Sequence, residues 1–276
     1  MHQSTIAYHD LAIFRSRNYP SFKIEYYWGG SLLKSNEILK GVAAGIADTG
    51  MIYTGYNPSE LPLLNATEVF PTVKATLPQT KQVYDKIRRD MPGDWDKVWS
   101  NLDLVCIGIS PLMPATMVSR APVRVLEDFK GMKIRIGSAV AGKAYEAVGA
   151  VPVFISLTET RESLASGLVD GAVYGSHIHV QYGLVDSTSY YNPLMTLYPG
   201  TGAYIMNRNT WNKLTPDIQK VILQVFSEAE GRTIDFMLNQ LSGIEAQIAA
   251  KGLETVGLES GELQRWTNLS AVRQMR

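Results

Sequence analysis

The chain has 276 residues, of which 45% are hydrophobic and 19% are charged, so it can bury an ordinary globular core in one large or two modest domains. Lysine plus arginine and aspartate plus glutamate balance at 26 each, which argues against a nucleic-acid-binding surface or an acidic tail. No uninterrupted apolar segment of about 18 residues is present, so we expect no membrane-spanning helix. No signal peptide is evident. An exported protein whose signal peptide has been removed would look this way, and so would a cytoplasmic protein.

The sequence indicates alternating helices and strands. Periodicity and composition predict these elements in the first part: helix 4–17, strand 22–28, helix 35–44, strand 51–53, helix 81–91 and strand 102–109. The second part continues with these: strand 132–136, a helix through Ala144 and Ala147, strand 151–155, a strand within 196–207 and a helix from Trp211 to about Lys251. Thr215 and Pro216 would cap and begin that last helix. The single cysteine, Cys106, lies in an apolar run and is interpreted as a buried hydrophobic residue.

Arg135 stands out because of its place in this pattern. It lies near the carboxyl end of strand 132–136, which ends at Gly137 and Ser138 before a helix. In open α/β sheets, ligands bind outside the carboxyl ends of the strands. An arginine there can hold a planar carboxylate through two parallel hydrogen bonds, so we expect an anion site at Arg135. Taken alone, the pattern also suits the polar end of an edge strand.

The run DFKGMKIRI, followed by GAVPV and LVDG, resembles the extracytoplasmic solute-binding proteins of TRAP (tripartite ATP-independent periplasmic) transporters. The resemblance extends over about residues 22–257. It implies an α/β, two-lobed periplasmic-binding-protein-like fold with a hinge and a long helix spanning both lobes. The lobes would comprise residues 1–122 with 208–251, and 123–207 with 252–276. Residues 119–125 would form a crossing between them.

The resemblance also implies a function. The chain would capture a small organic acid in an interlobe cleft and deliver it to the membrane permease subunits of a TRAP transporter, in the periplasm, without acting as an enzyme. The arginine of the family that matches Arg135 binds the substrate's carboxylate. The candidate ligand-binding residues are Trp28, Tyr53, Tyr56, Arg135, Leu157, Tyr174 and Tyr198.

Two departures from the family pattern narrow the expected ligand. Tyr174 stands where many relatives carry asparagine, and Ala115 lies near a position where some carry a second arginine. A single carboxylate anchor and a less polar pocket favour a monocarboxylate with an apolar or aromatic body. The pattern does not identify which acid this is.

Other functions have less support in the residues. His177 and His179 would share a face in a strand, but the segment is expected to be helical and no third ligand is evident, so we predict no metal site and no cofactor. No motif places a nucleophile or a general base, which disfavours an enzyme that uses the cleft. A ligand-sensing module that docks on a signalling receptor would have the same site and stays an alternative.

The two ends differ from the family pattern as well. Relatives usually begin with a strand that completes the sheet of the first lobe, whereas this chain starts inside the helix that follows it. The helix that begins near Leu263 is followed by fewer residues than is usual. We therefore expect either that the sequence is a shortened part of the protein, or that the edge of that sheet is filled by a neighbouring chain or by an altered lobe, because unpaired strands favour pairing between chains.

Overall fold

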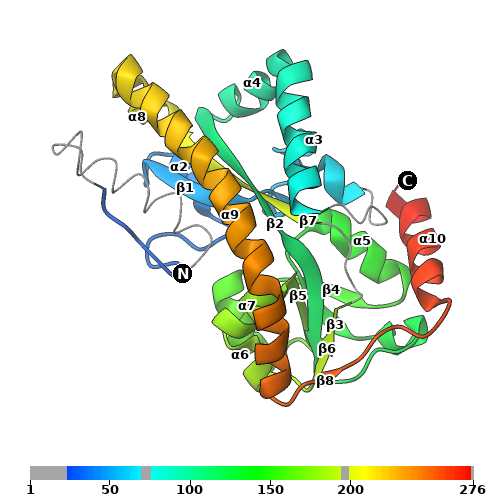
Figure 1. Ribbon diagram of the computed structural model, residues 1–276. Helices are drawn as coiled ribbons and strands as arrows, with labels where there is room; N and C mark the ends of the chain where they lie inside the picture. The colour runs from blue at the N-terminus through cyan, green and yellow to red at the C-terminus, as the bar shows by residue number, and fades with distance from the viewer. Residues whose placement is uncertain (1–23, 70–75, 194–198, 275–276) are drawn as a thin grey trace. The chain divides into compact units, whose positions relative to one another are not determined.

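The structure, a computed structural model, describes residues 24–69, 76–193 and 199–274. The chain divides into two compact units, whose elements are labelled in Figure 1. Unit 1 comprises Met1–Tyr53, Lys81–Pro111 and Thr201–Asn239, and unit 2 comprises Thr54–Thr80, Leu112–Gly200 and Gln240–Arg276. The lobe boundaries inferred from the sequence stay a prediction, as do the hinge segments.

Unit 1 is built on a sheet in the order β1–β7–β2, in which β1 runs antiparallel to β7. Its elements are α2 (Ile38–Ala43), β1 (Thr49–Tyr53), α3 (Leu77–Asp90), α4 (Pro92–Ser100), the first half of β2 (Leu104–Ser119), β7 (Pro199–Asn207), α8 (Arg208–Lys213) and most of α9 (Pro216–Ala250). The apolar face of α9 packs on the sheet, where the rings of Phe226 and Tyr204 lie 4.9 Å apart. In α4, Trp95 and Trp99 are buried edge to face.

A buried carboxylate fixes α9 to β2 within unit 1. Glu230 of α9 accepts a hydrogen bond from the Ile109 N–H at 2.7 Å and pairs with Lys81 of α3 at 3.1 Å. Burial raises the pKa of the Glu230 carboxyl, although the hydrogen bond and Lys81 both favour its charged form. The Glu230 carboxylate therefore supplies an acceptor for the Ile109 N–H of β2, which α9 covers.

Unit 2 contains a mixed sheet in the order β2–β5–β3–β4, with β6 beside β2 and β8 beside β6. Its strands are the second half of β2, β3 (Lys133–Ile136), β4 (Val151–Phe154), β5 (Gly171–Gly175), β6 (Tyr190–Asn192) and β8 (Glu254–Thr255). Its helices are η1 (Thr54–Tyr56), η2 (Pro62–Val69), η3 (Leu126–Phe129), α5 (Ala139–Ala147), α6 (Leu157–Ala165), α7 (Ser176–Gln181), η4 (Leu184–Ser187) and α10 (Glu262–Gln274). Because β3 is parallel to both β4 and β5, the carboxyl ends of these three strands meet at one edge.

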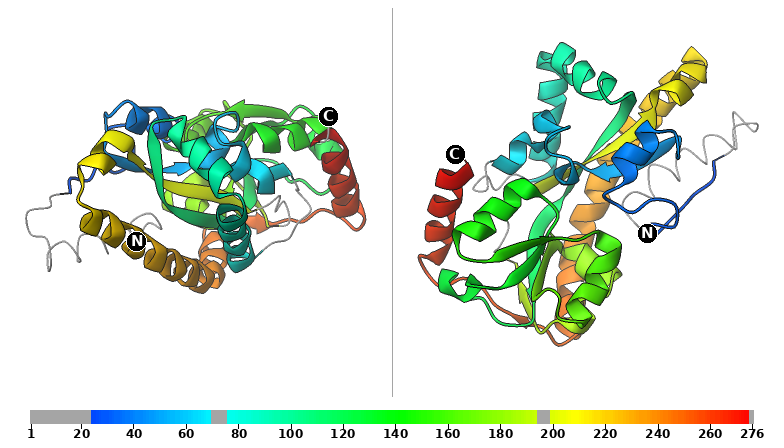
Figure 2. Two further views of the ribbon diagram at one scale, coloured as in Figure 1. Left: turned by 90° about the horizontal axis from the view of Figure 1, so that it is seen from above. Right: turned by 180° about the vertical axis from the view of Figure 1, so that it is seen from behind.

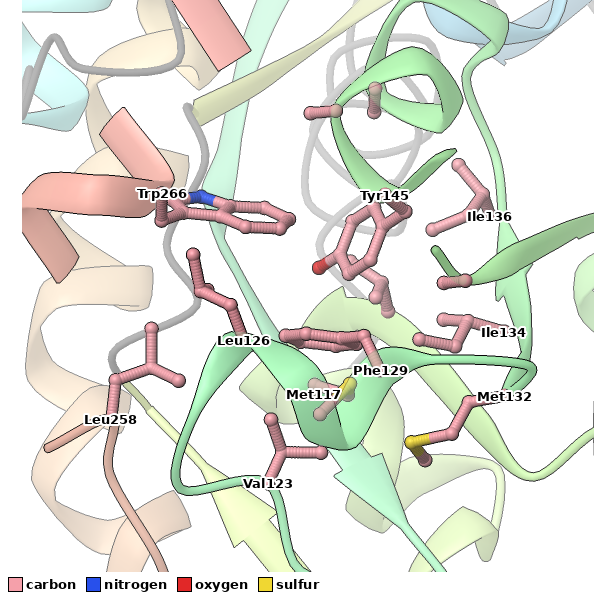
Figure 3. Packing of buried hydrophobic residues seen from close by; sticks show 14 residues of the cluster. Met117, Val123, Leu126, Phe129, Met132, Ile134, Ile136, Tyr145, Leu258 and Trp266 are labelled. Atoms are coloured by element: carbon pink, nitrogen blue, oxygen red, sulfur yellow. The ribbon is translucent and has the colours of Figure 1, made fainter. Parts of the chain in front are cut away.

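The core of unit 2 joins the sheet, α5 and the C-terminal helix α10. Figure 3 shows Trp266 of α10, Tyr145 of α5 and Phe129 of η3 packed against one another, with ring centroids 5.1–5.7 Å apart. Helix α10 lies beside α5 in each view of Figures 1 and 2. Glu262 reinforces the contact by accepting the Leu126 N–H at 2.8 Å.

Most of the predicted elements are present. The long helix is confirmed as α9, which contributes residues to both units, and the predicted terminal helix is α10. Strand 132–136 is confirmed as β3 and strand 151–155 as β4. The predicted helix 4–17 and the beginning of strand 22–28 lie outside the described residues.

Two strand predictions were wrong in extent. Residues 24–28 form no strand. The rings of Tyr26 and Trp28, two positions apart, stack on each other with their centroids 5.3 Å apart. Strand β2 extends to Ser119, ten residues beyond the predicted end, although it contains Pro111 and Pro114. Its pairing with β5 begins at Ala115, after both prolines, so neither removes a donor from that ladder. In the described part of the chain, no helix is both long and apolar enough to cross a membrane.

Candidate functional site

Arg135 lies inside unit 2 on the central parallel strand β3. Its side chain is only 1% exposed, and it is the largest of the fully buried residues. In the sheet it stands opposite Val153 of β4 and Ala172 of β5. Tyr174 follows Ala172 by two residues on β5, so alternation places it on the same face as Arg135. The strand order thus brings together two residues 39 positions apart in the sequence.

The hydrogen-bond partners of Arg135 are all neutral oxygens. Its Nε donates to the carbonyl of Ile155 at 2.9 Å, and Nη1 donates to the carbonyl of Val173 at 3.3 Å. Its Nη2 donates to the hydroxyl of Tyr56, the last residue of η1, at 2.7 Å. Among the described residues, no aspartate or glutamate forms an ion pair with it.

This arrangement leaves capacity for one more partner. A guanidinium has five N–H bonds, and three of those of Arg135 are used, which leaves one on each terminal nitrogen without a partner in the described part of the chain. A buried charge is costly unless it is paired and hydrogen-bonded. The site is therefore suited to an anion that accepts two hydrogen bonds.

Aromatic rings cover the guanidinium. Its central carbon lies 3.8 Å from the centroid of the Tyr174 ring, a close cation–π contact, and 5.8 Å from that of Tyr56. The Tyr174 hydroxyl in turn lies 2.8 Å from Thr160 Oγ1 in α6. Burial raises the pKa of Tyr174, and the nearby guanidinium only partly opposes this effect.

His179 of α7 is the next side chain behind Tyr174. Its ring is fully buried, 6.4 Å from the ring of Tyr174, and its Nε2 lies 3.1 Å from Thr116 Oγ1. Burial lowers the pKa of His179 to about 3, so it is neutral at pH 7. Arg135 therefore carries a positive charge, whereas Tyr56, Tyr174, Thr160 and His179 near it are neutral.

The other predicted site residues are distributed over both units. Leu157 is the half-buried first residue of α6 in unit 2, two positions after Ile155, whose carbonyl accepts from Arg135. Tyr53, the half-buried last residue of β1, and Trp28, which is 49% exposed, belong to unit 1. Tyr198 lies outside the described residues.

Sequence reasoning missed Thr160, and it considered His179 only as a metal ligand. Both residues are close to Arg135 through their contacts with Tyr174, which depend on how α6 and α7 pack on β5; the sequence carries no signal for that packing. His177 and His179 lie on α7, which confirms the predicted helix. No group of three His, Cys, Asp or Glu residues that could hold a metal occurs in residues 24–69, 76–193 and 199–274.

Comparison with known proteins gives a consistent result. The model of bacterial extracellular solute-binding protein family 7 (DctP) matches residues 96–273. A solute-binding protein of Albidiferax ferrireducens is 24% identical over 262 residues, which cover 92% of this chain and 75% of the relative.

Solved structures share the fold. The Bordetella pertussis extracytoplasmic solute receptor DctP7, which binds pyroglutamic acid, matches with a TM-score of 0.88 at 20% identity over 98% of this chain and 87% of that one. A TRAP periplasmic solute-binding protein from Rhodoferax ferrireducens with bound malonate matches with a TM-score of 0.82 at 22% identity over 96% and 84% of the two chains. These matches confirm the predicted two-lobed α/β fold.

The family match covers more than half of the chain and includes Arg135 and Tyr174. It confirms the resemblance inferred from the sequence and excludes the alternative of a cleft enzyme, because the family consists of binding proteins. The chain belongs to family 7 of the bacterial extracellular solute-binding proteins, the DctP family.

Proposed function

We propose that this protein captures a small organic monocarboxylate at Arg135 and delivers it, in the periplasm, to the membrane subunits of a TRAP transporter. The observation that carries the proposal is the fully buried guanidinium with neutral partners and two remaining N–H bonds. A carboxylate would accept both bonds and supply the missing opposite charge. The family assignment supports the transport role and the periplasmic location.

The charge of the site favours a monoanion over a dianion. Two tyrosine side chains contact the guanidinium, and a threonine and a neutral histidine contact Tyr174 behind it, so one positive charge is available. A second carboxylate would need another partner to offset its desolvation. Pyroglutamate, the ligand of the Bordetella receptor, meets this requirement, whereas malonate, the ligand of the Rhodoferax protein, carries two carboxylates.

The body of the acid would contact the remaining predicted residues. Leu157 offers an apolar side chain at the start of α6, and Tyr56 offers a hydroxyl. Tyr53 and Trp28 of unit 1 stay predicted contacts, and so does Tyr198.

A thermal-shift screen tests the proposed ligand class. Pyroglutamate, branched keto acids and aromatic monocarboxylates should raise the melting temperature, because a ligand that binds only the folded state stabilises it by mass action. Malonate, succinate and malate serve as the dicarboxylate comparison, and the Arg135→Ala protein serves as the control. A shift with dicarboxylates alone would overturn the preference for a monoanion. A shift of equal size in Arg135→Ala would overturn the site.

A further inference from the structure

Hydrogen bonds between hydroxyl groups connect Tyr174, whose ring covers Arg135, to helix α6. The Thr160 hydroxyl donates its single proton to the carbonyl of Ser156 at 2.9 Å. It can therefore only accept from Tyr174, so the Tyr174 hydroxyl is the donor in the 2.8 Å contact between them. On the other side of the guanidinium, the Tyr56 hydroxyl accepts a hydrogen bond from Nη2 of Arg135 at 2.7 Å.

The hydrogen bonds that hold the Tyr174 ring have one direction. The Tyr174 hydroxyl donates to Thr160, and Thr160 donates to the Ser156 carbonyl in the backbone of α6. Hydrogen bonds aligned in this way polarise and strengthen one another in a low-dielectric interior. Thr160 is fully buried, so no solvent competes for its hydroxyl.

The same hydrogen bonds determine the orientation of the ring that covers the arginine. The Tyr174 ring lies 3.8 Å from the guanidinium carbon, and its far end is held by Thr160. A ring fixed at both positions restrains the guanidinium plane from one face. The Ile155 carbonyl restrains the same group from its edge at Nε.

We infer that Thr160 and Tyr174 are positioning residues that hold the guanidinium of Arg135 in a single plane, so that a carboxylate is accepted only in that plane. The inference rests on the proposed function for its consequence in binding. It assigns Tyr174 to the support of the anchor, in addition to any contact with the body of the acid. Thr160 thereby contributes to the orientation of Arg135 without contacting the anion.

Nuclear magnetic resonance of the arginine side chains tests this without any ligand. The Arg135 signals are assigned by their loss in Arg135→Lys, and the rates of rotation about the bonds from Cζ to the terminal nitrogens are measured. Tyr174→Phe keeps the ring and removes the hydroxyl, and Thr160→Val keeps the shape and removes the acceptor. Both should accelerate the rotation by about tenfold, the change that the loss of one buried hydrogen bond produces.

The chain offers two matched controls. Thr160→Ser keeps the hydroxyl and should retain the slow rotation of wild type. Thr188 makes the same type of bond, to the Leu184 carbonyl at 3.1 Å, so Thr188→Val should leave Arg135 unaffected. Unchanged rotation in folded Thr160→Val and Tyr174→Phe overturns the inference; if Thr160→Val does not fold, Tyr174→Phe decides alone.

Calorimetry with pyroglutamate separates this inference from the proposed function. Thr160→Val should weaken binding by about tenfold in wild type and have no effect in Arg135→Lys, whose ammonium has no plane to orient. An equal loss in both backgrounds indicates a structural role and overturns the inference. If pyroglutamate does not bind wild type, that counts against the proposed ligand class, while the rotation rates still decide the role of Thr160.

Discussion

Arg135 combines a high cost of burial with few compensating partners. Three neutral oxygens hold it, and no described acidic residue pairs with it. Replacing a buried charge by an apolar residue of similar volume is often neutral or stabilising, whereas removing it from a complex leaves the bound anion unpaired. Binding and stability should therefore respond in opposite directions at this position.

Arg135→Met should abolish measurable acid binding without lowering the free energy of unfolding. Arg135→Ala should weaken binding by about 2–4 kcal/mol, and Arg135→Lys should recover only part of the loss because the planar fork is missing. Calorimetry and urea unfolding measure the two effects. Arg208→Lys, at a half-buried arginine of unit 1, is the control. Unchanged affinity in Arg135→Ala would contradict the proposed site.

His179 should make the stability of the protein depend on pH. Its pKa is lowered from 6.5 to about 3 by burial, so the unfolded chain takes up a proton that the folded chain does not. The stability contributed by the neutral imidazole is complete above pH 6.5 and is lost as the pH falls towards 3. The expected slope is about 1.4 kcal/mol per pH unit within this window.

Urea unfolding at several pH values between 7.5 and 4.5 measures that slope. The variant His179→Gln cannot take up the proton, so its free energy of unfolding should fall less steeply with pH than that of wild type. Equal slopes in the two proteins would show that His179 is not the titrating group.

Trp266 anchors helix α10 in the core of unit 2. Trp266 is 3% exposed and contacts both Tyr145 and Phe129, as Figure 3 shows. Trp266→Ala should lower the free energy of unfolding by about 3–5 kcal/mol, the usual cost of emptying such a space. Leu269→Ala, on the exposed side of the same helix, should cost little. Denaturant titration followed by far-UV circular dichroism compares the two variants.

The elements that the sequence predicts well are those whose signals are local. Pro216 and the apolar spacing around Phe226 indicate α9, and the glycine after Ile136 marks the end of β3. Strand 22–28 failed because a strand needs a partner as well as composition, and residues 24–28 have no pairing with another strand. The full length of β2 was missed because prolines normally end a strand. Strand β2 accommodates Pro111 and Pro114 because its pairing with β5 begins only at Ala115, which the sequence does not reveal.

The candidate site was predictable to the same degree. Arg135 follows from its place at a strand end, and Tyr174 from its position three residues after Gly171 of the LVDG motif. Their stacking required the parallel pairing of β3 and β5, which the sequence implies only through the family resemblance. Thr160 carries no sequence signal, because its role depends on a hydroxyl contact between α6 and β5.

At the scale of the whole molecule, the proposed transport role predicts a change of shape on binding. A receptor that signals its occupancy to a permease must differ between its free and bound states, and a ligand shifts that equilibrium only by its differential affinity. Small-angle scattering should show a smaller radius of gyration with saturating acid than without it. The Arg135→Ala protein should show no change. Identical radii at proven saturation would argue against closure as the output.

The placement of the buried tryptophans gives each unit its own intrinsic fluorophore. Trp95 and Trp99 lie in the interior of unit 1, and Trp266 lies in that of unit 2. Trp28 is already half in water and changes its emission little on unfolding. Replacing Trp266 by phenylalanine would leave an emission spectrum dominated by unit 1. Replacing Trp95, Trp99 and the half-buried Trp211 of unit 1 would leave one dominated by unit 2. The red shift of these two spectra along one denaturant gradient would then reveal whether the two halves of the receptor melt as one cooperative body or in succession.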